Sequence, residues 1–108
     1  MATLTVQTIT ASGLSPAYTP AAAGGDKLRP GKTTFLHVKN GDASAVTVTL
    51  ATPGTVDGLA IADRAVTVGA SDDQMIPVTA LYGDPADGGL AAVTYSATTS
   101  VTVAAIRI

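Results

Sequence analysis

The chain has 108 residues, a net charge of −2 and a pI near 4.9. That length suits one domain, and the acidic balance offers no basic face to a nucleic acid, which is therefore not an expected partner. The absence of cysteine excludes disulfides and thiolate metal sites, and no apolar run approaches the ~18 residues of a membrane span. The N-terminal residues lack the features of a signal peptide, so we expect one soluble domain over residues 1–108, made without a secretion signal.

The composition favours β-structure. All acidic residues are Asp, which is common in turns, and none is Glu, which favours helix interiors. Val and Thr, which prefer strands, are abundant. The apolar fraction of 46% consists mostly of Ala and Val, with few aromatic residues. The predicted core is therefore thin, and its stability is expected to depend partly on partner surfaces.

The first predicted strand spans residues 3–10 and is followed by a segment rich in small residues. That segment, residues 11–32, contains Pro16, Pro20 and Pro30. Proline has no backbone donor for a sheet ladder, so most of the segment is predicted to be an extended arm or a long loop.

Two alternating strands are predicted next, at residues 34–40 and 45–52. Leu36 and Val38 share one face of the first, and Val alternates with Thr in the second. The turn between them begins with the step Asn40-Gly41, which suits positive backbone angles. We expect these two strands to form a hairpin.

The remaining strands are predicted at residues 62–68, 74–81, 91–98 and 100–108. Pro77 indicates an edge or bulged strand. In the last strand the apolar residues change from odd to even positions after Ala105, which indicates a bulge or a strand buried on both faces. About seven short strands separated by turns predict an all-β fold. We predict a single sandwich, immunoglobulin-like or jelly-roll-like, with a small barrel as the alternative.

The string Gly31-Lys32-Thr33 resembles the end of a phosphate-binding loop. That motif needs a glycine five residues before Gly31, where this chain has Asp26. It must also open a helix, whereas the residues after Thr33 have a strand pattern. We therefore expect a turn that leads into a strand, and no nucleotide site.

His37 is the only histidine, which excludes a multi-histidine metal site within one chain. A single imidazole on a strand is expected to be a half-exposed surface residue without a catalytic role. Phe35, His37 and Lys39 share a face that suits neither a core nor an ordinary solvent surface, so we interpret it as a protein contact.

Carboxylates gather at Asp72-Asp73 and in the loop 82–89. Oxygen-rich loops can bind calcium, but neither string has the ligand spacing of a helix-loop-helix calcium site. We interpret these residues as turn formers. No serine has the setting of a nucleophile elbow, and no paired carboxylates stand with the aromatic residues of a sugar cleft. The sequence predicts no enzyme, cofactor, metal or small-molecule substrate.

Residues 33–68, TTFLHVKNGDASAVTVTLATPGTVDGLAIADRAVTV, resemble small β-sandwich proteins from the structural gene modules of tailed bacteriophages. The likeness lies in FLHVKNG, VTVTLATPG, DGLAIADRAVTV and the ending VTYSATTSVTVAAIRI, and it is greatest to capsid decoration, or cement, proteins. The resemblance implies a virion protein, made in the host cytoplasm, that binds the outer surface of the shell. It further implies a partner in the major capsid protein and a homo-oligomer, with a trimer favoured.

No contact residue carries over from that family, because its members differ in the segment that touches the shell. An extended arm can lie along a neighbouring subunit and add backbone hydrogen bonds at a sheet edge. We therefore place the candidate contact surface in residues 11–32 and the strand after them, at Tyr18, Lys27, Arg29, Lys32, Phe35 and His37. Two alternatives remain: a tail or head-to-tail component, and a carbohydrate-binding or adhesin module.

Overall fold

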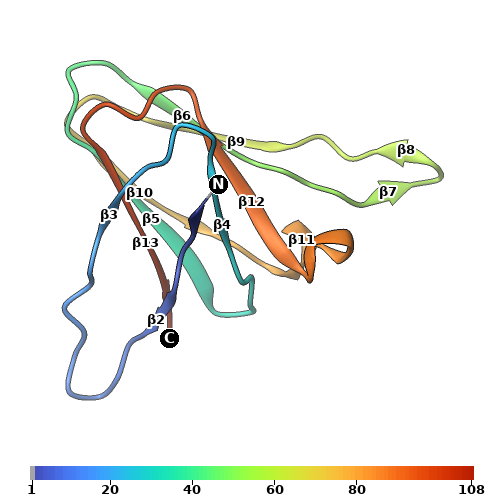
Figure 1. Cartoon of the computed structure of the whole chain (residues 1–108), viewed down its shortest axis with the longest axis horizontal. Coiled ribbons are helices and arrows are strands. Elements are labelled where there is room, and N and C mark those ends of the chain that lie inside the picture. Colours follow the sequence, from blue (N-terminus) through green and yellow to red (C-terminus); the bar gives the residue numbers. More distant parts are fainter. Residues whose placement is uncertain (1) are drawn as a thin grey trace.

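Two β-sheets pack face to face in the computed structural model, which describes residues 2–108 (Figure 1). The first sheet has the order β1-β4-β12-β6-β9, with β11 also paired to β12, and consists of Ala2–Thr3 (β1), Asp26–Leu28 (β4), Val46–Leu50 (β6), Arg64–Val68 (β9), Gly83–Asp84 (β11) and Leu90–Tyr95 (β12). The second has the order β10-β5-β13-β2, with β3 also paired to β13, and consists of Val6–Thr8 (β2), Thr19–Pro20 (β3), Thr34–Asn40 (β5), Asp73–Pro77 (β10) and Val101–Arg107 (β13). The predicted all-β sandwich is confirmed.

A third, two-stranded sheet pairs Thr55–Val56 (β7) with Leu59–Ala60 (β8) at the end of a projection between β6 and β9 (Figure 1). Two single turns of 3-10 helix, Ala80–Tyr82 and Pro85–Asp87, follow β10. Among the residues that the structure describes, no helix is long and apolar enough to cross a membrane.

The core forms because the apolar residues of each strand face the opposite sheet. In β6, Val46, Val48 and Leu50 are buried, while Thr47 and Thr49 point outward and are only half-buried. Each such aliphatic side chain contributes about 1.5–3 kcal/mol when it leaves water. In β6 the alternation of apolar and polar residues is thus enough to define which face of the strand points into the core.

The second sheet is centred on β5 and β13, which pair over their full length. In β13 the consecutive residues 103–106 are all buried, so this strand is covered on both faces. Burial on both faces explains why the apolar residues of this strand do not keep to alternate positions, and it is one of the two predicted alternatives. The placement of the strand containing Pro77 is also confirmed, because β10 lies at the edge of the sheet.

The predicted hairpin of residues 34–40 and 45–52 is wrong. The strands found there, β5 and β6, lie in different sheets, and the turn between them carries the chain across the sandwich. Neither Asn40 nor Gly41 has a positive φ. Instead, the buried Asn40 side chain donates hydrogen bonds to the carbonyls of Ser44, Val68 and Gly69, which fixes the crossing.

Residues 11–32, expected to be an arm or a long loop, contain two strands. The stretch up to Tyr18 is a loop, but β3 pairs with β13, and β4 lies between β1 and β12. Asp26 and Leu28 in β4 are buried. This second half of the segment is therefore part of the sandwich, since it places a leucine in the core between two neighbouring strands.

Candidate functional site

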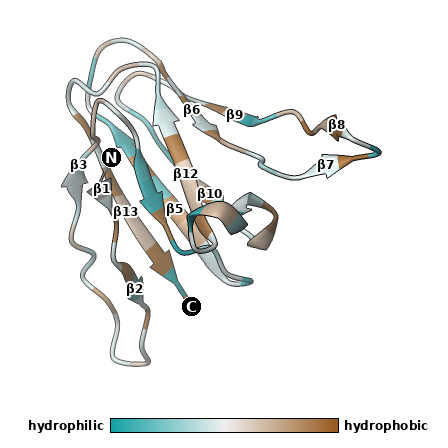
Figure 2. Cartoon of the chain, turned by 45° about the vertical axis from the view of Figure 1, so that its right-hand side comes forward, coloured by the Kyte–Doolittle hydropathy of each residue, from teal (hydrophilic) through white to brown (hydrophobic). Residues whose placement is uncertain are grey.

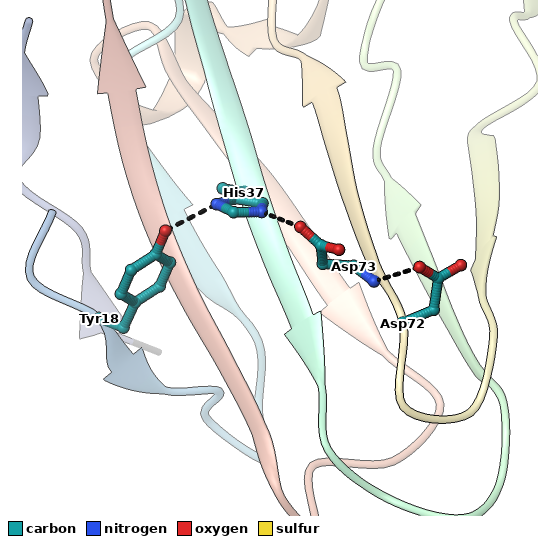
Figure 3. A network of polar contacts seen from close by, with 4 residues as sticks. All are labelled: Tyr18, His37, Asp72 and Asp73. Atoms are coloured by element: carbon teal, nitrogen blue, oxygen red, sulfur yellow. Dashed lines mark hydrogen bonds and ion pairs between the residues drawn. The ribbon is translucent and has the colours of Figure 1, made fainter.

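A chain of polar contacts crosses the outer face of the second sheet (Figure 3). Tyr18, just before β3, places its hydroxyl 2.7 Å from Nδ1 of His37 in β5. Nε2 of the same imidazole lies 2.6 Å from Oδ2 of Asp73 in β10. His37 as a whole residue is only 6% exposed, so the expectation of a half-exposed histidine is wrong. The residue is buried because partners from two other elements cover it.

The hydrogen bonds of this network are mutually consistent. The Asp73 carboxylate accepts, so Nε2 of His37 carries a proton and donates it. In the neutral imidazole Nδ1 then accepts the hydroxyl proton of Tyr18. The Asp72 carboxylate accepts a further bond from the backbone amide of Asp73, at 2.8 Å. The hydroxyl of Tyr18 therefore has a defined acceptor on the sheet, and this contact holds the Tyr18 ring against His37.

An apolar groove of about 200 Å³ adjoins this network. Its walls come from the loop 9–18 and from the outward residues of β5, β10 and β13, and they comprise Ile9, Leu14, Pro16, Tyr18, Phe35, His37, Met75 and Ile106. Met75 is 62% exposed. We call this feature the outer groove. It brings together three of the six predicted contact residues, namely Tyr18, Phe35 and His37.

The loop that forms one wall of the outer groove is tied down by Gln7. The Gln7 side-chain amide donates to the carbonyl of Ala17 and accepts from its backbone N–H, both at 2.9 Å. The ammonium of Lys39 lies 4.1 Å from the centre of the Tyr18 ring, which places a cation at the rim of the groove. The groove is therefore preformed and apolar inside, with the Lys39 ammonium beside the Tyr18 ring at one edge.

The three predicted cations lie elsewhere. Lys27 in β4 forms an ion pair with Asp87, and Arg29 donates to the carbonyl of Gly88 at 3.3 Å. These two side chains contact the loop after β11 on the first sheet. Lys32 is exposed in the turn that leads into β5 and does not line the outer groove. The six predicted residues thus do not form one surface.

The sequence reasoning missed the projection that carries β7 and β8. We call residues 51–63 the projecting hairpin; in Figure 2 its outer end has hydrophobic residues on both strands and a hydrophilic tip. Val56 is 62% exposed and Leu59 is 73% exposed. Asp57 and Gly58 form the two-residue tip, with φ of 51° and 76°. The available signal was the Asp-Gly step between apolar residues, which is typical of a tight hairpin.

A second buried polar pair lies between the sheets. Asp26 in β4 is 1% exposed and accepts hydrogen bonds from the Tyr95 hydroxyl at 2.7 Å and from the Ala22 amide at 3.3 Å. Burial raises the pKa of the Tyr95 phenol well above its ordinary range, and the hydrogen bond and negative charge of Asp26 raise it further. This phenol is a fixed donor at neutral pH, and the pair has a structural role.

The acidic loops act as turn formers. The Asp84 carboxylate accepts from the Ala86 amide at 3.0 Å, which caps the second 3-10 turn. Asp42 and Asp72 each accept from the backbone amide of the next residue. Among residues 2–108, no three carboxylate or imidazole groups are close enough together to hold a metal ion.

Comparison of the chain with protein-family models, curated proteins and solved structures gives no match.

Proposed function

We propose that this protein is a non-enzymatic structural component of a bacteriophage virion that binds the outer surface of the assembled capsid and stabilises it. The observation that carries the proposal is the projecting hairpin, which extends two apolar side chains, Val56 and Leu59, away from the sandwich. An exposed apolar projection of this kind is typical of a protein contact. The resemblance to decoration proteins implies the major capsid protein as the partner and a trimer as the expected form.

A repeating shell suits a protein with these surfaces. The exposed side chains at the tip are few, so a single contact is weak. On a shell, many identical sites stand close together, and a trimer engages several of them at once with a high effective concentration. Occupancy then holds neighbouring capsid subunits together, because each bound oligomer links more than one of them.

Binding to empty shells tests the proposal directly. We expect the purified protein to co-sediment with empty capsids of the phage that encodes it, at saturation with many copies per shell. Shells that carry the protein are expected to disassemble at a higher temperature than bare shells. Electron cryo-microscopy of the same particles locates the protein. Density at one vertex only would favour the tail or head-to-tail alternative, and no co-sedimentation would overturn the proposal.

A paired set of variants tests the role of the projecting hairpin in binding. Val56→Ser with Leu59→Ser removes the two apolar side chains from its tip. The control is Leu81→Ser with Ile108→Ser, because those side chains are 55% and 73% exposed at other places. We expect the tip variant to lose most of its shell binding and the control to keep it. Equal loss in both would remove the hairpin from the proposal.

A further inference from the structure

We infer that the projecting hairpin of one copy inserts Val56 and Leu59 into the outer groove of a second copy of this chain. Both surfaces are apolar, and both are open in the single chain. The inference concerns the protein in solution: the tip joins copies into an oligomer, and the shell contact of the proposed function is made by that oligomer, so loss of the tip weakens shell binding by breaking the oligomer. It names the two surfaces through which the oligomer forms.

The two surfaces cannot meet within one molecule. The projecting hairpin connects β6 to β9 and so extends from the first sheet. The outer groove lies on the second sheet, on the face that points away from the core, because its residues in β5 alternate with the buried Leu36 and Val38. A contact between hairpin and groove therefore joins two copies.

The size of the outer groove suits side chains. Its volume, about 200 Å³, is below the roughly 300 Å³ at which pockets for small organic ligands begin. The lining is mostly aliphatic and aromatic, so it favours branched apolar groups such as those of Val and Leu. A protruding apolar tip is a closer match to this space than a separate small molecule.

Charge complementarity supports the same pairing. Asp57 stands between the two apolar residues at the tip, and Lys39 stands at the rim of the outer groove. Asp73 lies directly across from Lys39 in the neighbouring strand, but its carboxylate contacts His37, and among residues 2–108 no ion pair engages Lys39. Seating the hairpin brings opposite charges together at the edge of an apolar contact.

Both partners are held in shape before they meet. The two-residue turn at Asp57 and Gly58 has positive φ at both positions, which matches the natural twist of a hairpin. At its base, the Thr52 amide donates to the Asp63 carboxylate at 2.9 Å. The wall of the groove is fixed by the Tyr18 and Gln7 contacts. Little ordering entropy is lost on association, which favours affinity.

The oligomeric mass in solution, measured by sedimentation equilibrium without capsids, tests the inference. Leu59→Ser is expected to weaken association by about tenfold to a hundredfold, as one aliphatic side chain loses its burial. The matched control, Leu81→Ser, is expected to leave the mass unchanged. A wild-type protein that stays monomeric at high concentration, or an oligomer that Leu59→Ser does not weaken, overturns the inference.

A charge swap identifies the two residues that meet. Asp57→Lys and Lys39→Glu each place like charges at the contact, so each is expected to weaken association. The protein with both substitutions restores an opposite pair and is expected to recover most of it. If the double variant associates no better than the single ones, Asp57 does not meet Lys39, and this arrangement of the contact is wrong.

Mixing two defective chains separates a lost contact from a misfolded chain. The variant with Val56→Ser and Leu59→Ser keeps an intact groove, and Met75→Glu keeps an intact hairpin but places a charge in the groove. Each alone is expected to remain monomeric with an unchanged unfolding temperature. Together they are expected to form one-to-one pairs. Absence of pairs, with both chains folded, overturns the inference. Association is measured on the wild-type protein without capsids, so a protein that binds shells yet stays monomeric in solution overturns this inference alone, and one that associates but binds no shell overturns the proposed function alone.

Discussion

Two neighbouring regions that both contain valine and leucine have opposite fates in this molecule. The strand β6 reads Val-Thr-Val-Thr-Leu, and its Val48 and Leu50 are fully buried. A few residues later, the projecting hairpin carries Val56 and Leu59, which are mostly exposed. The difference is position, because β6 faces the second sheet whereas the hairpin extends beyond it (Figure 1). Identical side chains therefore stabilise the fold in one region and are available for association in the other.

The polar groups differ in the same way. In the sandwich, buried polar side chains such as Asp26, His37 and Asn40 are hydrogen-bonded to other parts of the chain. The projecting hairpin is held by its own short ladder and, nearer its base, by hydrogen bonds from the Ile61 amide to Gly54 and from the Thr52 amide to Asp63. Changes in the sandwich are thus expected to alter the free energy of unfolding, and changes in the hairpin to alter association. The predictions below test this division.

The largest expected effect is on the core. Leu36→Ala removes a fully buried side chain from the centre of the second sheet, and we expect a loss of about 2–5 kcal/mol in the free energy of unfolding. The same truncation at the exposed Leu59 is expected to cost less than about 0.5 kcal/mol. Urea unfolding of the two variants measures both values. Similar losses at both positions would contradict the division.

The next effect concerns the buried pair of Asp26 and Tyr95. Tyr95→Phe removes the phenol that donates to the buried carboxylate, and we expect a loss of about 1–3 kcal/mol near neutral pH. Tyr82→Phe is a suitable control, because that side chain packs against the core without a hydrogen bond to a buried carboxylate. Chemical unfolding at fixed pH distinguishes the two.

The same pair predicts a pH dependence. The pKa of Tyr95 is raised in the folded protein above its ordinary value of 10.0. Below that value both states keep the proton, so this contribution to stability is fully present. Above it, only the unfolded chain releases the proton, and the wild type loses about 1.4 kcal/mol per pH unit through this group. The difference in free energy of unfolding between the wild type and Tyr95→Phe is therefore expected to shrink between about pH 9 and pH 11. A constant difference would contradict this.

A smaller effect is expected at the outer groove. Tyr18→Phe keeps the ring but removes one hydrogen bond to His37, for which we expect a loss of about 0.5–1.5 kcal/mol. Because this bond holds the loop 9–18, amide hydrogen exchange in that loop is expected to become faster. Exchange in the projecting hairpin is expected to stay unchanged. If both regions change equally, the network does not act locally on the groove.

The sequence was sufficient to predict the sandwich, because strand alternation depends only on which residues face the core. It was insufficient for the path between strands. Asn40-Gly41 has the composition of a hairpin turn, yet β5 pairs with β10 and β13, and the chain crosses to the other sheet. Strand β4 was missed because only three residues pair, between a glycine and a proline turn.

The candidate site was only partly predictable, for a related reason. Tyr18 and Asp73 meet His37 across 19 and 36 residues of sequence, and their contact depends on the order of strands in the second sheet. The face with Phe35 and His37 was visible as unusual, but the residues opposite it were not. The Asp57-Gly58 step at the tip was visible in the sequence. That the hairpin extends beyond the second sheet was not, because this depends on how the two sheets overlap.

The smallest effect on stability, with the largest on assembly, is expected from shortening the projecting hairpin. Replacing residues 55–60 by Asn-Gly keeps a two-residue turn between Gly54 and Ile61, whose backbones already approach each other. All of the removed residues are exposed, so we expect the free energy of unfolding to change by less than about 0.5 kcal/mol. Sedimentation is expected to show a monomer. A loss of stability comparable to that of Leu36→Ala would mean that the hairpin belongs to the folding core. In that case its exposed valine and leucine would no longer indicate a contact between copies.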